Sequence, residues 1–225
     1  MEYLPRDVLK IMLARLDDKE VNSLYRNKSL IPVLDSIFED NSFWKIRVEN
    51  LLKIEETDLA FNNWKRIYYA LLKTKDLKVY AEKGDSEVVE LLLVDPRVDP
   101  SVDNNYAIWM ASQKGHDKVV ELLLANSRVD PSDGDNFAIR LASQYGRYKV
   151  VELLLADPRV DPSAEDNYAI RFASANGHDK IVELLLADPR VDPSADNNYA
   201  IRWASRKGHD KVVKLLKNYF AKLRT

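Results

Sequence analysis

Three histidines are the residues of this chain whose type suits a metal ion, and they occupy equivalent places in near-identical segments. His116, His178 and His209 each follow a glycine, within segments that recur at a spacing of 31 residues. A zinc ion needs each ligating nitrogen within about 2.0–2.1 Å, whereas equivalent positions of stacked segments lie at least a helix diameter apart. The histidines are therefore predicted to be turn residues and not ligands.

The many carboxylates do not suggest a catalytic pair either. They recur in every segment, most of them suit helix starts or Asp-Pro connections, and neither a nucleophile nor a phosphate-binding glycine loop accompanies them. The absence of cysteine removes disulfides and thiolate chemistry. An enzyme needs one distinct site, whereas in this sequence the candidate residues recur in several copies. We therefore expect no enzymatic activity, no metal and no cofactor.

The duplicates belong to a repeat that fills the last two thirds of the chain. Four clear copies begin at Asp103, Gly134, Glu165 and Asp196, and a degenerate copy begins at Asp76. One such unit cannot bury its own apolar face. The copies are therefore predicted to stack into a solenoid.

Each copy is predicted to form two helices joined by a tight turn. In the first clear copy, apolar residues at helical spacing run from Tyr106 towards Gly115, and a glycine suits a left-handed helix end. A second short helix starts at Asp117, which can cap its first turn. The Asp130-Pro131 pair then forces an extended connection. The buried stripe of the second helix is predicted to be Val119, Val120, Leu122 and Leu123.

Residues 76–225 resemble an ankyrin-repeat array. The likeness is carried by Ala111-Ser112, Gly115-His116, the run from Val119 to Leu123, and Val129-Asp130-Pro131, together with their counterparts in later copies. The resemblance implies an all-α fold, an ankyrin-type helical solenoid of about five repeats. The period of 31, shorter than the family's usual 33, suggests a shortened hairpin finger with its tip at Asp103-Asn104, because Asn and Asp tolerate left-handed conformations.

The pair of residues before the turn glycine differs most between copies. In the ankyrin family this end of the first helix lines the concave binding face, so the resemblance implies contacts with a protein target. The alternative is that exposed helix ends vary because nothing constrains them. The residues at issue are Gln113, Lys114, Gln144, Tyr145, Ala175, Asn176, Arg206 and Lys207.

A second row of equivalent positions holds Trp109, Arg140, Arg171 and Arg202, which we call the arginine row. Nearby acids, Asp135, Asp166 and Asp196, favour a structural ladder of ion pairs. The alternative is that the arginines bind an acidic peptide of the target bidentately. The next residue in each copy is predicted to lie in the core: Met110, Leu141, Phe172 and Trp203.

Charge is unevenly distributed along the chain. Residues 1–75 are nearly neutral, residues 76–195 carry a net charge of −9, and residues 196–225 carry +6. The acidic middle argues against a general nucleic-acid surface, because phosphate binding needs clustered cations. The basic end is expected to be a solvated cap with Lys214 and Lys217 facing water, or else a surface for an acidic partner or membrane phosphate. No apolar run reaches membrane-spanning length, and the first residues lack the apolar core of a secretory leader. We expect a monomer in a reducing compartment, the cytoplasm.

The first 75 residues do not follow the repeat. Apolar residues at helical spacing follow Leu4-Pro5, and Asp17-Asp18 ends this helix and caps the next. The segment 1–54 resembles an F-box, a small helical domain that binds a Skp-type adaptor of a cullin ubiquitin ligase. The resemblance implies that these residues contact the adaptor or support such contacts: Leu4, Pro5, Val8, Leu9, Met12, Leu13 and Leu16.

Residues 55–75 are predicted to be a linker and a capping helix, whose aromatics dock on the first repeat ahead of the array at 76–225. An N-terminal F-box before such repeats is similar to proteins of large DNA viruses that infect amoebae. The predicted function is that of a substrate receptor, in which the ankyrin groove holds a target and the F-box-like segment recruits ligase machinery. The alternative is a plain binding scaffold or inhibitor whose N-terminal helices only cap the solenoid.

Overall fold

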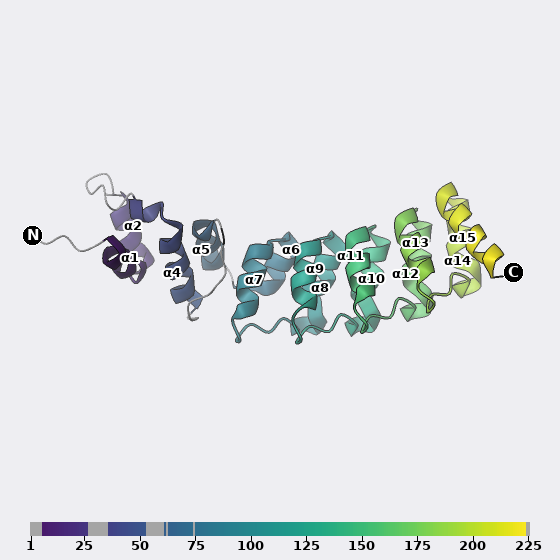
Figure 1. The fold of residues 1–225 in the computed structure, drawn as a ribbon, viewed down its shortest axis with the longest axis horizontal. Coiled ribbons are helices and arrows are strands. Elements are labelled where there is room, and N and C mark those ends of the chain that lie inside the picture. The colour runs from purple at the N-terminus through teal and green to yellow at the C-terminus, as the bar shows by residue number, and fades with distance from the viewer. Residues whose placement is uncertain (1–5, 27–35, 53–60, 62, 74, 224–225) are drawn as a thin grey trace, which may run out of the picture. The chain divides into compact units, whose positions relative to one another are not determined.

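The computed structural model describes residues 6–26, 36–52, 61, 63–73 and 75–223, and every regular element in these ranges is a helix (Figure 1). The chain divides into two compact units, Met1–Lys75 and Asp76–Thr225. The all-α class and the helical solenoid predicted from the sequence are confirmed.

The first unit contains short helices whose ends follow local capping rules. Asp17 accepts a hydrogen bond from the backbone N–H of Glu20 at 2.8 Å, and the Glu20 carboxylate accepts one from the Asp17 N–H at 2.8 Å. This reciprocal capping box is the helix start that the Asp17-Asp18 pair predicted. The described helices are α1 (Arg6–Ala14), α2 (Asp18–Arg26), α4 (Asn41–Leu52) and α5 (Trp64–Lys73).

Aromatic side chains form the centre of this unit, with α4 packed against α1 and α5. Trp44 is 2% exposed, and its indole N–H donates to the Phe38 carbonyl at 2.8 Å. The ring of Tyr68 on α5 lies 5.5 Å from that of Trp44. Tyr68 also lies 4.7 Å from the Arg47 guanidinium, so it contributes to packing inside the first unit, and docking of the α5 aromatics on the first repeat stays a prediction.

The second unit consists of helix pairs that stack in two rows (Figure 1). The first helices of the copies are α6 (Leu77–Lys83), α8 (Val102–Lys114), α10 (Asp133–Gln144), α12 (Ala164–Ala175) and α14 (Ala195–Arg206). The second helices are α7 (Ser86–Val94), α9 (Asp117–Leu124), α11 (Tyr148–Ala156), α13 (Asp179–Ala187) and α15 (Asp210–Lys222). Each helix contacts its partner in the same copy and the equivalent helix of the next copy.

The array buries one aliphatic residue set in each copy. In the third copy, Ile139, Ala142, Val151 and Leu154 are fully buried. Two predictions about the core need correction. Leu122 is half-buried, and so are Met110, Leu141, Phe172 and Trp203. In the three middle copies the isoleucine two positions earlier takes the interior position instead, because residues two apart in a helix lie on different faces.

Three consecutive left-handed residues open each of the last four copies. In the first of them, Asp103, Asn104 and Asn105 have φ values of 55°, 57° and 59°. Non-glycine residues rarely adopt this conformation in succession. The predicted tolerance of Asp103-Asn104 for it is confirmed, but the described part of the array contains no hairpin finger, and this left-handed turn stands in its place.

The last residue of the left-handed turn is asparagine in each of these four copies, and in three of them its side chain bonds to the connection that ends the same copy. The Asn105 side-chain oxygen accepts from the Asp130 N–H at 2.9 Å, and its amide nitrogen donates to Asp133 at 2.9 Å. Asn136 accepts in the same way from Asp161 at 2.7 Å. These bonds offset the conformational cost of the turn.

The turn between the two helices of a copy differs from the prediction in one respect. Gly115 has φ 85° and ends α8 in the left-handed conformation, as predicted. Asp117 does not cap α9, because the N-cap residue is His116 and its side chain makes no capping bond. Asp117 lies in the first turn, where a negative charge is favourable near a helix N-terminus.

Candidate recognition surfaces

The residue before the turn glycine is exposed in each of the four clear copies. We call Lys114, Tyr145, Asn176 and Lys207 the pre-glycine row, and the Tyr145 side chain is 46% exposed. The preceding position is more variable: Gln113 and Gln144 are half-buried, Ala175 is buried, and Arg206 is exposed.

Some of these residues also join neighbouring copies. Gln144 accepts a hydrogen bond from the Tyr168 hydroxyl at 2.8 Å, and its carbonyl accepts from the Asn176 amide at 3.1 Å. Lys207 donates to the Asn176 side-chain oxygen at 3.5 Å. Among the described residues, the structure records no hydrogen bond and no ion pair for the side chains of Lys114 and Tyr145, so these two side chains are the part of the row most available to a partner.

The histidines reach back to the preceding copy. His178 Nε2 lies 3.0 Å from the Gln144 carbonyl, which can only accept, so this nitrogen donates. The His178 ring also covers Gly146, where an added Cβ would meet it at 2.7 Å. His116 and His209 make equivalent contacts, and Arg147 replaces the histidine in one copy by donating to the Gln113 carbonyl at 2.8 Å. The histidines are thus turn residues that link copies.

The arginine row is largely occupied by contacts within the array. Arg171 pairs with Asp196 of the next copy at 2.7 Å, as the ladder hypothesis predicted. Arg140 lies 4.0 Å from Glu165, so its acid is the residue before the predicted Asp166. Both arginines expose only 14% of their side chains.

Aromatic rings enclose the same two guanidinium groups. The Arg140 guanidinium lies 5.1 Å from the centroid of Phe137 and 5.3 Å from that of Tyr168 in the next copy. Arg171 lies 5.4 Å from the Tyr199 centroid. Cation–π contacts of this kind add to the ion pairs, so these arginines serve the stacking of copies.

Trp109 holds the arginine-row position of its copy, and the next copy has no acid opposite it. The next copy has Gly134 at the position of Glu165 and Asp196, and an added Cβ on Gly134 would meet the Trp109 ring at 2.7 Å. In the first copy, Lys78 holds the same row position and pairs with Asp103 at 2.5 Å. Each interface between copies therefore has a matched pair, and comparing the two rows one copy apart would have shown this from the sequence.

The carboxylates of the connections hold their own loops. Asp157 pairs with Arg159 at 2.6 Å, and this hydrogen bond lowers the pKa of Asp157 despite partial burial. Arg159 also donates to the Val129 carbonyl of the preceding copy at 2.8 Å. Asp188 and Arg190 repeat the arrangement. Within the residues the structure describes, no group of three or more His, Cys, Asp or Glu side chains can hold a metal ion.

The residues predicted to contact an adaptor differ in how far they are exposed to solvent. Met12 is 52% exposed, Leu13 is 6% exposed, and Leu16 is half-buried. Leu4 and Pro5 lie outside the described residues, as do the side chains of Val8 and Leu9. Ile11 beside Met12 is 43% exposed, so α1 presents two adjacent apolar side chains to solvent.

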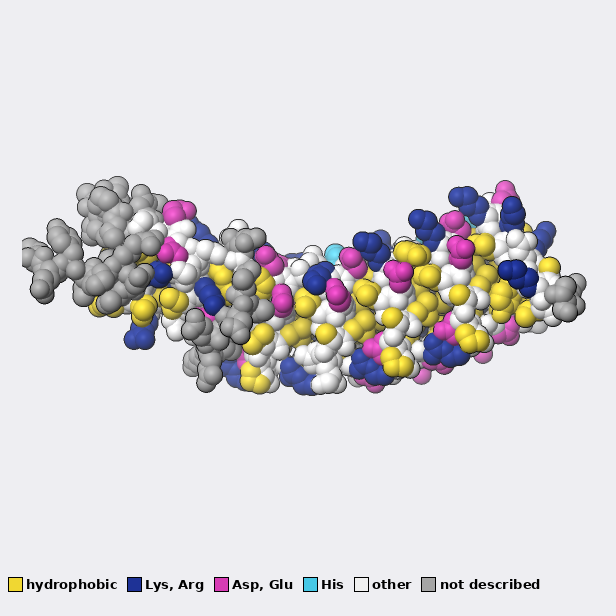
Figure 2. Space-filling model, in the orientation of Figure 1, with side chains coloured by type: hydrophobic (Ala, Val, Ile, Leu, Met, Phe, Trp, Pro, Cys, Tyr) yellow, Lys and Arg dark blue, Asp and Glu magenta, His cyan; other side chains and the backbone are white. Residues whose placement is uncertain are grey.

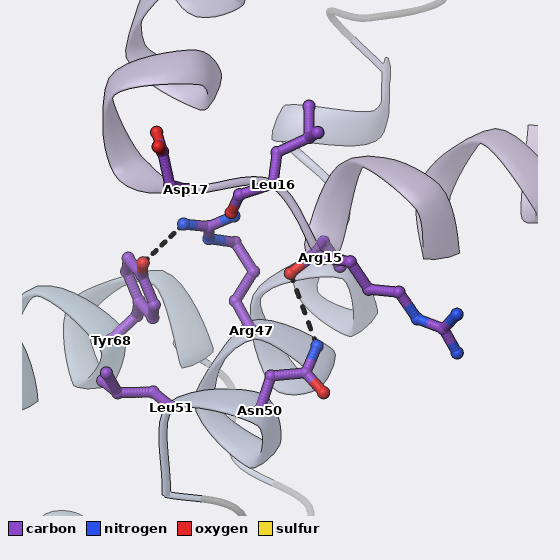
Figure 3. A pocket seen from close by; sticks show the side chains of 8 residues that line it. Arg15, Leu16, Asp17, Arg47, Asn50, Leu51 and Tyr68 are labelled. Atoms are coloured by element: carbon purple, nitrogen blue, oxygen red, sulfur yellow. Dashed lines mark hydrogen bonds between the residues drawn. The ribbon is translucent and has the colours of Figure 1, made fainter.

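A cavity of about 350 Å³ beside the end of α1 contains the buried Arg47 (Figure 3). Arg47 is 4% exposed and donates to the Leu16 carbonyl at 2.9 Å and to the Tyr68 hydroxyl at 2.5 Å. Asn50 donates to the Ala14 carbonyl at 3.4 Å. These bonds satisfy carbonyls that a helix end leaves without partners, so the polar groups of this cavity stabilise the unit.

Stacked helix pairs with an exposed row of variable residues define a helical-repeat binding protein. A family model for ankyrin repeats matches three copies over residues 77–166. This segment therefore contains ankyrin repeats, a type of repeat that supports a role in protein–protein interaction. No curated protein matches the chain. None of the helices in the described residues is long and apolar enough to cross a membrane.

Proposed function

We propose that the repeat array binds a protein target through the pre-glycine row. The observation that carries this proposal is the combination of exposure and variation at Lys114 and Tyr145. Most other differences between copies are explained by contacts between copies. The exposed Tyr145 ring is of the residue type enriched at the hot spots of protein interfaces, and Lys114 one repeat away adds a positive charge.

The other residues predicted to contact the target are proposed to contribute to binding to different degrees. Gln113, Gln144, Asn176, Arg206 and Lys207 extend the same surface along the array. Trp109, Arg140 and Arg171 support stacking and are proposed to contribute only through the parts of their side chains that face solvent. Arg202, in contrast, is exposed.

The test is capture of partners from the native cell, with the double variant Lys114→Ala/Tyr145→Ala beside the wild-type chain. The expected result is loss of at least one captured protein at unchanged thermal stability. A matched variant on the second helices, Lys118→Ala/Tyr148→Ala, should capture the same proteins as wild type. If the two double variants behave alike, or if stability and capture fall together, the row is scaffold and the proposal fails.

The second part of the proposal is that the first unit binds a Skp-type adaptor, which would make the protein a substrate receptor of a cullin ubiquitin ligase. The exposed apolar pair Ile11 and Met12 on α1 supports it, because adjacent exposed apolar side chains suit a protein interface. The likeness to viral proteins stays a prediction.

A binding measurement with purified Skp-type adaptor tests this part. The wild-type chain should bind, and Met12→Asp and Pro5→Ala/Leu9→Asp should each weaken binding at least tenfold. Tyr69→Asp is the matched control, since Tyr69 is 43% exposed on α5. No binding by the wild-type chain, or equal binding by Met12→Asp, would leave the plain scaffold or inhibitor, in which these helices only cap the array.

A further inference from the structure

Arg202 is the one arginine of this row for which no acid is found among the described residues. The cations at this position in three earlier copies each meet a carboxylate of the following copy: Asp103, Glu165 and Asp196. Arg202 is exposed, and it donates only to the Asp196 carbonyl at 3.3 Å. In the described ranges no carboxylate lies within ion-pair distance of it.

The sequence of the last copy explains why Arg202 lacks this carboxylate partner. The earlier second helices lead into an Asp-Pro connection that carries the next left-handed turn and its acid. Here α15 continues instead through Asn218-Tyr219-Phe220 to Lys222. The contact that pairs Arg140 and Arg171 is therefore not supplied by residues 207–223.

Two further cations stand beside Arg202 on the same helix end. Arg206 follows one turn later, so both arginines lie on one helix face. The guanidinium of Arg206 lies 5.3 Å from the Trp203 ring, and the Lys207 ammonium lies 6.0 Å from it. Arg206 and Lys207 are exposed and Trp203 is half-buried. This end of α14 thus combines three cations with an accessible aromatic ring, within a segment whose net charge is +6.

The matched interfaces indicate what would bind here. Arg171 pairs with the Asp196 carboxylate at 2.7 Å, and its guanidinium lies 5.4 Å from the centroid of the Tyr199 ring. Arg140 contacts Glu165 and Tyr168 in the same way. In both cases the aromatic residue comes three positions after the acid. The complement of this arginine position is therefore a carboxylate followed by an aromatic ring.

We propose that Arg202, Arg206 and Lys207, with Trp203, bind an acidic segment of the partner protein in which an aromatic residue follows an acid at this spacing. The inference rests on the proposed function, because it names the chemistry of the partner at one end of the array. A second copy of this chain stacked end to end does not fit, since its first repeat has Leu72 and Lys75 at the corresponding places.

The test uses the full chain labelled with ¹⁵N and a peptide with the sequence of residues 192–201, which contains both Asp196 and Tyr199. The signal is the Trp203 indole N–H resonance, with Trp44 as the internal reference. The peptide should shift the Trp203 resonance saturably, and more weakly as salt is raised, because exposed charges are screened. A control peptide with Asn in place of both aspartates and Ala in place of the tyrosine should bind at least tenfold more weakly.

Two variants locate the site. Arg202→Gln/Arg206→Gln should weaken binding of the acidic peptide at least tenfold. Lys118→Gln/Lys149→Gln, which removes the same charge from exposed positions of the second helices, should leave it unchanged. Equal binding of both peptides, or equal binding by the arginine variant, would overturn the proposal. Binding of phosphatidylserine vesicles in place of the peptide would also overturn it and assign the cluster to lipid phosphate.

The outcome separates this inference from the proposed function. A chain that loses its partner on Lys114→Ala/Tyr145→Ala but ignores the acidic peptide retains the proposed function and loses only this end site. A chain that binds the peptide through Arg202 but keeps every partner in the Lys114/Tyr145 variant keeps the end site and loses the pre-glycine row.

Discussion

The two units of this protein bury apolar side chains by different rules. In the first unit, each contact of the Trp44 cluster occurs once, between helices that have no counterparts. In the array, a contact such as the His178 ring on Gly146 recurs in the next copy as His209 on Gly177. Residues that serve only the scaffold can therefore be recognised in the array by recurrence, and recognition residues by their departure from it. The first unit offers no such internal comparison.

Within the array, charge follows the same division. Figure 2 shows Lys and Arg side chains gathering towards the C-terminal end of the array. In the middle copies, acids and bases pair across interfaces. In the last copy, Arg202 has no carboxylate within ion-pair distance among the described residues, which separates a stacking residue such as Arg171 from an exposed one such as Arg202.

The largest effect is expected in the first unit. Trp44→Ala should reduce its free energy of unfolding by about 3–5 kcal/mol, because a fully buried ring and its hydrogen bond are lost. Hydrogen exchange should rise across α4 and α5 while the array from α8 onwards keeps its protection. Equal loss of protection in the array would show that the two units unfold as one.

A cavity in the array tests the opposite behaviour. Leu154→Ala should cost about 2–5 kcal/mol, since this leucine is fully buried in α11. Because a repeat contacts only its neighbours, exchange should increase most in α10 to α13 and least in α7. Chemical denaturation gives the magnitude, and a uniform rise in exchange along the array would contradict the repeat picture.

The glycine under each histidine allows a matched pair of substitutions. Gly146→Ala and Gly208→Ala place a side chain at the same φ of 75°, which costs about 1–2 kcal/mol. Only Gly146 also lies under a histidine ring, whereas a Cβ on Gly208 meets nothing within 4 Å. Thermal denaturation should therefore show the larger loss for Gly146→Ala. Equal losses would mean that the His178 ring moves away freely.

The smallest effect concerns one loop carboxylate. Asp157→Asn should cost about 1 kcal/mol at pH 7, because the pair lies at the surface with the Arg159 side chain 40% exposed, although Asp157 itself is partly buried. The pKa of Asp157 is lowered in the folded state by its hydrogen bond to Arg159. Its contribution is therefore fully present above the ordinary pKa of about 3.9 and is lost as the pH falls through the lowered folded value.

Urea denaturation at pH 7 and at about pH 2 measures this difference. The gap between wild type and Asp157→Asn should close at the lower pH. The equivalent position of the preceding copy is Asn126, which already accepts from the Arg128 N–H at 3.0 Å. Asn126→Asp should make the reverse change, and a gap that persists in acid would point to a contribution independent of charge.

Much of the array was predictable because its signals are local and repeated. Helix spacing, the left-handed glycine and the Asp-Pro connection each depend on neighbouring residues, and each of these signals recurs in four copies. The errors concern contacts over longer distances. Leu141 and Phe172 are apolar and helical, yet which face of α10 and α12 points inwards depends on the neighbouring copy. Asp117 suits a helix cap, yet His116 occupies that place because its ring bonds to the preceding copy.

The amino-acid sequence alone determined that this protein is a stack of helix pairs, since a unit with one apolar face and a recurrence of 31 residues has no other way to leave water. Aligned copies suggest candidate partners for these cations, but only the tertiary structure decided which of them stacking covers: Arg140 and Arg171 expose 14% of their side chains, and Arg202 is exposed. Arg140, Arg171 and Arg202 are the same residue type at equivalent positions of the repeat. Their difference arises from whether a carboxylate and a ring reach the guanidinium, and that depends on positions brought together in space.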